Sequence, residues 1–183
     1  MVDRGFGVVT TTDPEAQSQA RAAFTRTSRS LDDTAALATL VAQTLVPGDV
    51  VLLVGELGAG KTAFAKFVGQ ALGCTSPLTS PTFTIMTQHR ARLNGSPGML
   101  LHLDAYRLEG ADAIEEIGVL ELLDEGAVAV IEWGDIVAAA FGDDPLRIEI
   151  AAVGDDERMF TVSAHREGPW VGRVEVMAQG DTT

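Results

Sequence analysis

Short runs of apolar residues alternate along this chain with longer segments in which apolar positions recur every three or four residues. Residues 50–54 and 127–131 are continuous apolar runs, typical of strands buried on both faces of a sheet. Residues 61–72 show helical spacing and end at Gly73, a residue suited to a left-handed helix cap. This alternation predicts an α/β fold with a largely parallel sheet.

The N-terminal part is predicted to contain one helix after a flexible tail. Ser30 is followed three residues later by Asp33, a capping pattern, and the Pro-Gly-Asp turn at 47–49 ends the helix. Apolar side chains lie between them at helical spacing: Leu37, Leu40, Val41 and Leu45. Residues 1–29 are polar and carry no periodic core pattern, so we expect a flexible tail with a short helix around residues 16–24. Residues 30–183 are expected to form a single domain.

The remainder of the chain is mainly strand-like. Strands are predicted over residues 83–88, 99–104, 147–152, 159–165 and 172–177, and a helix over residues 111–124. A Gly-Asp-Asp turn at 154–156 joins two of these strands into a hairpin. We therefore predict a three-layer α/β sandwich with a mixed, mostly parallel sheet and antiparallel edge strands.

Composition excludes several classes of function. The 183 residues carry a formal net charge of −13 without a basic stripe, which argues against direct binding to the phosphates of DNA or any other nucleic acid. Cys74 is the only cysteine, so no intramolecular disulfide and no cysteine-rich metal site can form. No apolar run approaches the roughly 20 residues that span a bilayer, and the polar N-terminus lacks the apolar segment of a signal peptide. These features predict a cytoplasmic protein that does not enter a membrane.

One motif indicates a specific chemistry: residues 55–62 match the phosphate-binding pattern G-x-x-x-x-G-K-[ST]. A chain of this length matches the pattern by chance about 1% of the time at average residue frequencies. A predicted strand precedes the loop and a predicted helix follows it, as the motif requires. The loop consists of Gly55, Glu56, Leu57, Gly58, Ala59, Gly60, Lys61 and Thr62.

This motif predicts that the chain binds ATP or ADP together with Mg²⁺. Gly55 and Gly60 permit backbone conformations that turn successive N–H groups toward an anion, and the following helix adds its N-terminal dipole. Lys61 would place its charge between the β- and γ-phosphates, and Thr62 would offer its hydroxyl to Mg²⁺. The predicted sandwich is accordingly that of the P-loop NTPases.

Two acids at strand ends are candidates for a further metal contact, as P-loop sites require. Asp104 follows the apolar strand at 100–103, and Glu132 follows the run at 127–131. Strand-end position does not choose between them, and both could serve the site, one binding the metal and one orienting water. His102, inside an apolar strand, is interpreted as a core histidine. Trp133, directly after Glu132, fits core packing and the site equally well.

Three further segments, taken with the loop, resemble the TsaE family (formerly YjeE) of bacterial ATPases in tRNA threonylcarbamoyladenosine biosynthesis. They are Ser-Pro-Thr-Phe at 80–83, His-Leu-Asp-Ala-Tyr-Arg-Leu at 102–108, and Ile-Glu-Trp at 131–133. The resemblance implies ATP hydrolysis coupled to a TsaB–TsaD complex, which attaches threonylcarbamoyl to adenosine 37 of tRNAs that read codons beginning with A. The chain would then drive the cycle of its partners and meet tRNA only indirectly.

The resemblance also implies roles for individual residues near the phosphates. Lys61 and Thr62 match the phosphate and Mg²⁺ ligands of the family, and Glu132 matches its second metal ligand. Asp104 matches an acid that is associated with catalysis, and Trp133 pairs with Glu132 at the site.

Other positions match the family less directly or depart from it. Thr82 occupies a switch-like position, and Thr34, at the start of the first helix, resembles a position near the adenine pocket. Ala63 lies in the nucleotide-binding segment where a second threonine is common, so one hydroxyl near the α-phosphate is missing. Ala105 replaces the more usual leucine, and residues 1–29 are additional.

Other functions of a P-loop protein remain as alternatives. A small-molecule kinase needs an acceptor site and usually an arginine-rich lid over the phosphates, and no arginine-rich segment follows the loop. A GTPase is disfavoured because the guanine-reading pattern N-K-x-D is absent. A nucleotide-gated binding module would differ from the TsaE interpretation only in having little turnover.

Overall fold

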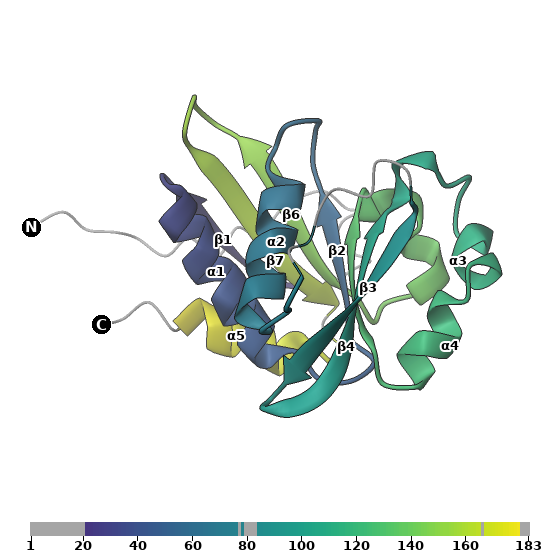
Figure 1. Cartoon of the computed structure of the whole chain (residues 1–183). Helices are drawn as coiled ribbons and strands as arrows, with labels where there is room; N and C mark the ends of the chain where they lie inside the picture. The colour runs from purple at the N-terminus through teal and green to yellow at the C-terminus, as the bar shows by residue number, and fades with distance from the viewer. Residues whose placement is uncertain (1–20, 77, 79–83, 166, 180–183) are drawn as a thin grey trace, which may run out of the picture.

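The computed structural model describes residues 21–76, 78, 84–165 and 167–179. Within them the strands form one seven-stranded sheet in the order β1-β7-β6-β2-β5-β4-β3 (Figure 1). The strands are β1 (Arg21–Ser28), β2 (Val50–Val54), β3 (Met86–Leu93), β4 (Ser96–Asp104), β5 (Val128–Glu132), β6 (Leu146–Ala152) and β7 (Arg158–His165). The helices are α1 (Leu31–Thr44), α2 (Lys61–Ala71), α3 (Asp112–Glu116), α4 (Val119–Asp124) and α5 (Val171–Gln179), with 3₁₀ turns η2 (Ala105–Arg107), η3 (Gly134–Ile136) and η4 (Ala138–Phe141).

The centre of the sheet is parallel. β6, β2, β5 and β4 run in one direction, β3 pairs antiparallel with β4, and β7 pairs antiparallel with both β6 and β1. The predicted mixed sheet and the predicted hairpin of β6 and β7 are confirmed. Because the carboxyl ends of parallel strands meet at one edge of a sheet, the residues that follow β2, β4 and β5 come together there.

Helices cover both faces of this sheet. α1, α2 and α5 pack on one face, against a core that includes Val51 and Leu53 of β2 (Figure 1). α3, α4, η3 and η4 cover the other face, whose core includes Val50 and Leu52. The continuous apolar run of β2 is therefore buried on both faces, and the predicted three-layer sandwich is confirmed.

The predicted tail of residues 1–29 is wrong for residues 21–28, which form the edge strand β1. β1 pairs with β7 along its whole length, and Ala22 is buried while Phe24 packs against the core. The short helix expected at 16–24 is wrong for the same reason where it overlaps β1, and residues 1–20 lie outside the described residues. Only two apolar side chains, those of Ala22 and Phe24, anchor the strand, since Ala23 is exposed and the remaining residues are polar. The ladder to β7 thus determines this strand, and local composition did not indicate it.

Removing residues 1–28 should therefore destabilise the domain. The truncation loses the ladder between β1 and β7 and the packing of Phe24, which we put at about 3 kcal/mol or more. At about 2–4 °C per kcal/mol for a domain of this size, thermal unfolding should shift down by at least about 6 °C. Removing only residues 1–20 is the matched control, since it leaves the strand whole. Equal melting temperatures for the two truncations would contradict the role given to β1.

The strand predicted over 172–177 is also wrong, because this segment forms helix α5. Val174 and Met177 are both buried in the core, and their separation of three residues is helical rather than strand-like. The Arg173 guanidinium donates hydrogen bonds to both carboxylate oxygens of buried Asp49, just before β2. This ion pair ties the C-terminal helix to the start of the central strand.

Two other predicted elements differ in extent. The helix expected over 111–124 is divided into α3 and α4 at Gly118, whose φ of +73° lies in the left-handed region that interrupts helices. The strand expected over 83–88 begins at Met86 and continues to Leu93, because Asn94 and Gly95 form the two-residue turn to β4. Among the described residues, none of the helices has the length and apolar character needed to cross a membrane.

Candidate functional site

The phosphate-binding loop connects the end of β2 to the start of α2. Gly55 has φ of +148°, and a Cβ atom on it would lie 2.3 Å from the carbonyl oxygen of Ile150 in β6. Glycine is therefore required at this position by both conformation and space. Gly60, with φ of +113°, turns the chain into α2. The first N–H groups of this helix, which have no acceptor within the helix, face the loop and favour an anion.

The Lys61 side chain folds back into this loop. Its Nζ donates to the carbonyl oxygens of Gly55 (2.6 Å) and Glu56 (2.9 Å) and lies 3.6 Å from the centroid of the Trp133 ring. Burial lowers the pKa of Lys61, and the nearby carboxylates of Glu132 and Asp104 oppose that shift. The ammonium is thus held by weak neutral acceptors, which a phosphate could replace with a full negative charge.

Thr62 and Glu132 are in direct contact beside this lysine. The Thr62 hydroxyl donates to Glu132 Oε2 at 2.6 Å, and His102 Nε2 lies 2.9 Å from Glu132 Oε1. Glu132 ends β5, where it lies opposite Leu53 of β2 in the ladder. Parallel pairing of β5 with β2, and the start of α2 just after the loop, therefore bring an acid and a hydroxyl together from positions 70 residues apart.

Asp104 ends the neighbouring strand β4 and lies opposite Glu132 in the ladder. Its Oδ1 accepts a hydrogen bond from the Tyr106 backbone N–H at 3.1 Å, and its charge acts on Lys61. Asp104 therefore borders the site, whereas Glu132 is the acid that contacts Thr62.

Trp133 adopts a backbone conformation that is rare for a bulky residue, with φ of +57°. The next residue explains this turn: a Cβ atom on Gly134 would lie 2.6 Å from Leu52 Cβ, so Gly134 lets the chain pass close to β2. The turn places the Trp133 ring against Lys61 and 5.0 Å from the ring of Tyr106. Tyr106 itself is 65% exposed at the mouth of the site.

A cavity of about 350 Å³ adjoins the loop on the side of α1. Residues from three segments of the chain, 28–34, 59–63 and 156–160, line it, among them Thr34, Ala59, Gly60, Ala63, Arg158 and Phe160. The hydroxyl of Thr34 is 2.8 Å from that of Ser28, so β1 helps to form the wall. Arg158 Nε donates to the carbonyl oxygen of Ala59 at 3.1 Å, which links the β6–β7 hairpin to the loop.

Most of the sequence-predicted site residues therefore lie together. The loop, Glu132, Trp133 and Asp104 surround Lys61, and Thr34 and Ala63 line the adjoining cavity. Thr82 lies outside the described residues.

Sequence reasoning missed two contributors. His102 is buried in the core, as expected, but it also contacts Glu132. Its position two residues before Asp104 on a strand, and hence on the same face, was the available signal. Arg158 had no signal, because its partners are backbone carbonyls such as that of Ala59, far away in the sequence.

The donor atoms at the site suit a magnesium ion that is shared with a phosphate. Thr62 and Glu132 offer oxygen atoms, which Mg²⁺ prefers. Within the described part of the chain, no group of three or more His, Cys, Asp or Glu side chains could hold a metal on its own. An ion held by Thr62 and Glu132 would complete its coordination with phosphate oxygens and water, as Mg²⁺ commonly does.

Comparison with known proteins agrees with this geometry. Residues 28–160 match the family described as threonylcarbamoyl adenosine biosynthesis protein TsaE. The chain belongs to the TsaE family. The part of the chain that matches the TsaE family contains the loop, Asp104, Glu132 and Arg158, and it ends before helix α5.

Individual TsaE relatives cover most of the chain. The tRNA threonylcarbamoyladenosine biosynthesis protein TsaE of Mycobacterium tuberculosis is 38% identical over 156 residues, which are 82% of this chain and 92% of the relative. The TsaE protein of Streptomyces coelicolor is 41% identical over 143 residues, or 75% of this chain and 95% of the relative. The crystal structure of YdiB from Bacillus subtilis superposes with a TM-score of 0.70 at 29% identity and covers 89% of this chain. The similarity to known proteins thus extends to the fold as well as to the sequence.

Proposed function

We propose that this chain is a Mg²⁺-dependent ATPase that works with a TsaB–TsaD complex to form threonylcarbamoyladenosine at position 37 of tRNAs that read codons beginning with A. The TsaE family connects the chain to the biosynthesis of this modified nucleoside. The observation that supports ATP chemistry most directly is the 2.6 Å contact between Thr62 and Glu132 beside the Lys61 ammonium. A glycine-rich turn without a ligand would have no need for this arrangement.

Each part of the proposed nucleotide site has its own residues. The loop backbone and Lys61 would hold the phosphates, and Thr62 and Glu132 would hold Mg²⁺, which neutralises charge on the phosphate oxygens. The cavity between α1 and the loop, lined by Thr34 and Ala63, would receive the nucleoside of ATP or ADP. Asp104, on the ladder beside Glu132, is the candidate for orienting the attacking water.

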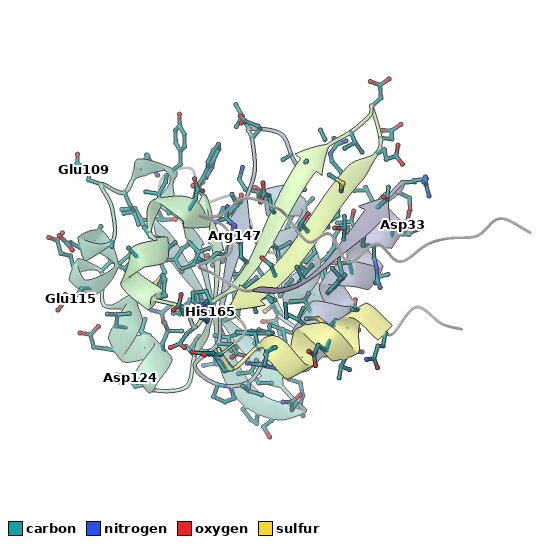
Figure 2. The ribbon with its side chains drawn as sticks, turned by 180° about the vertical axis from the view of Figure 1, so that it is seen from behind. Asp33, Glu109, Glu115, Asp124, Arg147 and His165 are labelled. Atoms are coloured by element: carbon teal, nitrogen blue, oxygen red, sulfur yellow. The ribbon has the colours of Figure 1, made fainter. Side chains whose placement is uncertain are left out.

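The distribution of charge supports indirect contact with tRNA. Residues 108–146 contain no lysine, arginine or histidine. Exposed carboxylates cover the region of α3 and α4, and Figure 2 shows Glu109, Glu115 and Asp124 pointing away from it. The exposed acids of this region are Glu109, Asp112, Glu115, Glu116, Glu121, Asp124 and Glu125. This surface would repel the phosphates of a nucleic acid. A protein complex that itself binds tRNA would avoid the problem.

The decisive experiment compares phosphate release by the chain alone, with TsaB–TsaD, and with candidate small-molecule acceptors. We expect slow hydrolysis alone, a marked acceleration with TsaB–TsaD, and threonylcarbamoyladenosine in the added tRNA. Fast hydrolysis that ignores TsaB–TsaD would contradict the proposal. Transfer of phosphate to a small acceptor would favour a P-loop small-molecule kinase instead.

A further inference from the structure

We propose that His102 is a positioning residue, which holds the Glu132 carboxylate in the orientation needed for Thr62 and the metal. The inference rests on the proposed Mg²⁺–ATP function and adds to it a residue that would touch neither metal nor nucleotide. His102 would act only through Glu132.

The geometry of three side chains carries this inference. His102 lies on β4 opposite Val130 of β5, and two residues further along the same ladder Asp104 lies opposite Glu132. A carboxylate oxygen only accepts hydrogen bonds, so His102 Nε2 is the donor in the 2.9 Å contact with Glu132 Oε1. The second oxygen, Oε2, accepts from the Thr62 hydroxyl at 2.6 Å. Donors from two sides thus determine how the carboxylate is turned.

Packing alone does not explain a histidine at this position. The imidazole is fully buried, and its Nδ1 has no hydrogen-bond partner among the described residues. A buried polar atom without a partner costs free energy. On the same face of the sheet, Leu100 of β4 and Val130 of β5 are fully buried, so an apolar side chain would suit the core better. The contact of Nε2 with Glu132 is the feature that a leucine could not supply.

Loss of this donor would act on the metal site through Glu132. Glu132 Oε1 would become a buried acceptor without a donor, and the carboxylate could turn away from Thr62. Residues that orient a metal ligand by a hydrogen bond typically contribute about 10- to 100-fold in metal affinity or activity. The nucleotide itself would lose no contact, since His102 lies behind Glu132 in the core.

Two neutral amides of different length test the inference. In His102→Gln the side-chain nitrogen can reach the position of Nε2, whereas in His102→Asn the amide ends near the position of Nδ1. We expect His102→Asn to weaken Mg²⁺ in the ternary complex with ATP by about 10- to 100-fold and His102→Gln to stay close to the parent chain. ATP affinity in EDTA should be unchanged in both variants. Mg²⁺ titrations of ATP binding, with thermal unfolding of each variant, measure these effects.

The outcomes separate this inference from the proposed function. Equal Mg²⁺ affinities for the parent and His102→Asn, or equal losses in both variants, would overturn the role of His102 alone. If the ATP affinity of the parent chain does not depend on Mg²⁺, both the proposed function and this inference are overturned. Should His102→Asn fail to fold, nitrogen NMR of the parent decides, because the chain has only three histidines. The His102 ring signals must then shift on addition of Mg²⁺ and ATP while those of His165 stay, and an unshifted His102 would refute the inference.

Discussion

Replacing Lys61 by alanine should abolish ATP hydrolysis and weaken ATP binding while leaving the fold intact. Among the described residues, the ammonium contacts the loop carbonyls of Gly55 and Glu56 and the face of the Trp133 ring. Lys61 is not a member of either apolar core cluster, so both clusters keep all their side chains in the variant. A hydrogen bond to a charged group is worth about 1.5–3 kcal/mol, which corresponds to about 10- to 150-fold in affinity. Burial lowers the pKa of Lys61, which means that the folded state disfavours the charged ammonium. Removing the ammonium should therefore change the temperature of thermal unfolding little.

Phosphate release, ATP titration and thermal unfolding check this prediction together. Lys66→Ala is the matched control, because Lys66 is an exposed lysine on the same helix, α2. We expect the control to behave like the parent chain in all three measurements. Undiminished turnover in Lys61→Ala would remove the basis for the proposed ATPase function.

Glu132→Gln and Asp104→Asn should have different effects. Glu132 contacts Thr62 and is the proposed metal ligand, so replacing its charge should weaken Mg²⁺-dependent ATP binding. The effect should be at least as large as the loss of a residue that orients a ligand, which costs about 10- to 100-fold. Asp104 borders the site without touching Thr62, so Asp104→Asn should mainly lower turnover, by about 10²- to 10⁴-fold if the acid handles a proton of the attacking water.

Mg²⁺ titrations and single-turnover hydrolysis distinguish the two acids. Glu121→Gln serves as the control for loss of one negative charge, since this carboxylate is exposed on α4. If Asp104→Asn affects Mg²⁺ and Glu132→Gln affects only turnover, the two roles must be exchanged.

Elements with a strong local signal were predicted well. The run at 50–54 is strand β2, and the run at 127–131 corresponds to β5 shifted by one residue, to Val128–Glu132, because strands covered on both faces are apolar at nearly every position. Helix α2 follows the loop because the G-x-x-x-x-G-K-[ST] pattern requires that order and the apolar spacing agrees. Two peripheral elements were not predicted. The polar edge strand β1 exists through its ladder to β7, and α5 through the burial of Val174 and Met177.

The sequence by itself determined the phosphate loop and identified both acids of the candidate site, because glycines, a lysine and a threonine at fixed spacing leave few other structures open. Only the tertiary structure decided which acid contacts Thr62. That contact depends on the register of β5 against β2 and on where α2 begins, and neither is a local property. The same holds for His102, whose partner Glu132 is 30 residues away, and for Arg158, which reaches the loop from 99 residues away. Hydrogen bonds between residues so far apart in sequence form only when the strands have paired, so a short sequence motif cannot predict them.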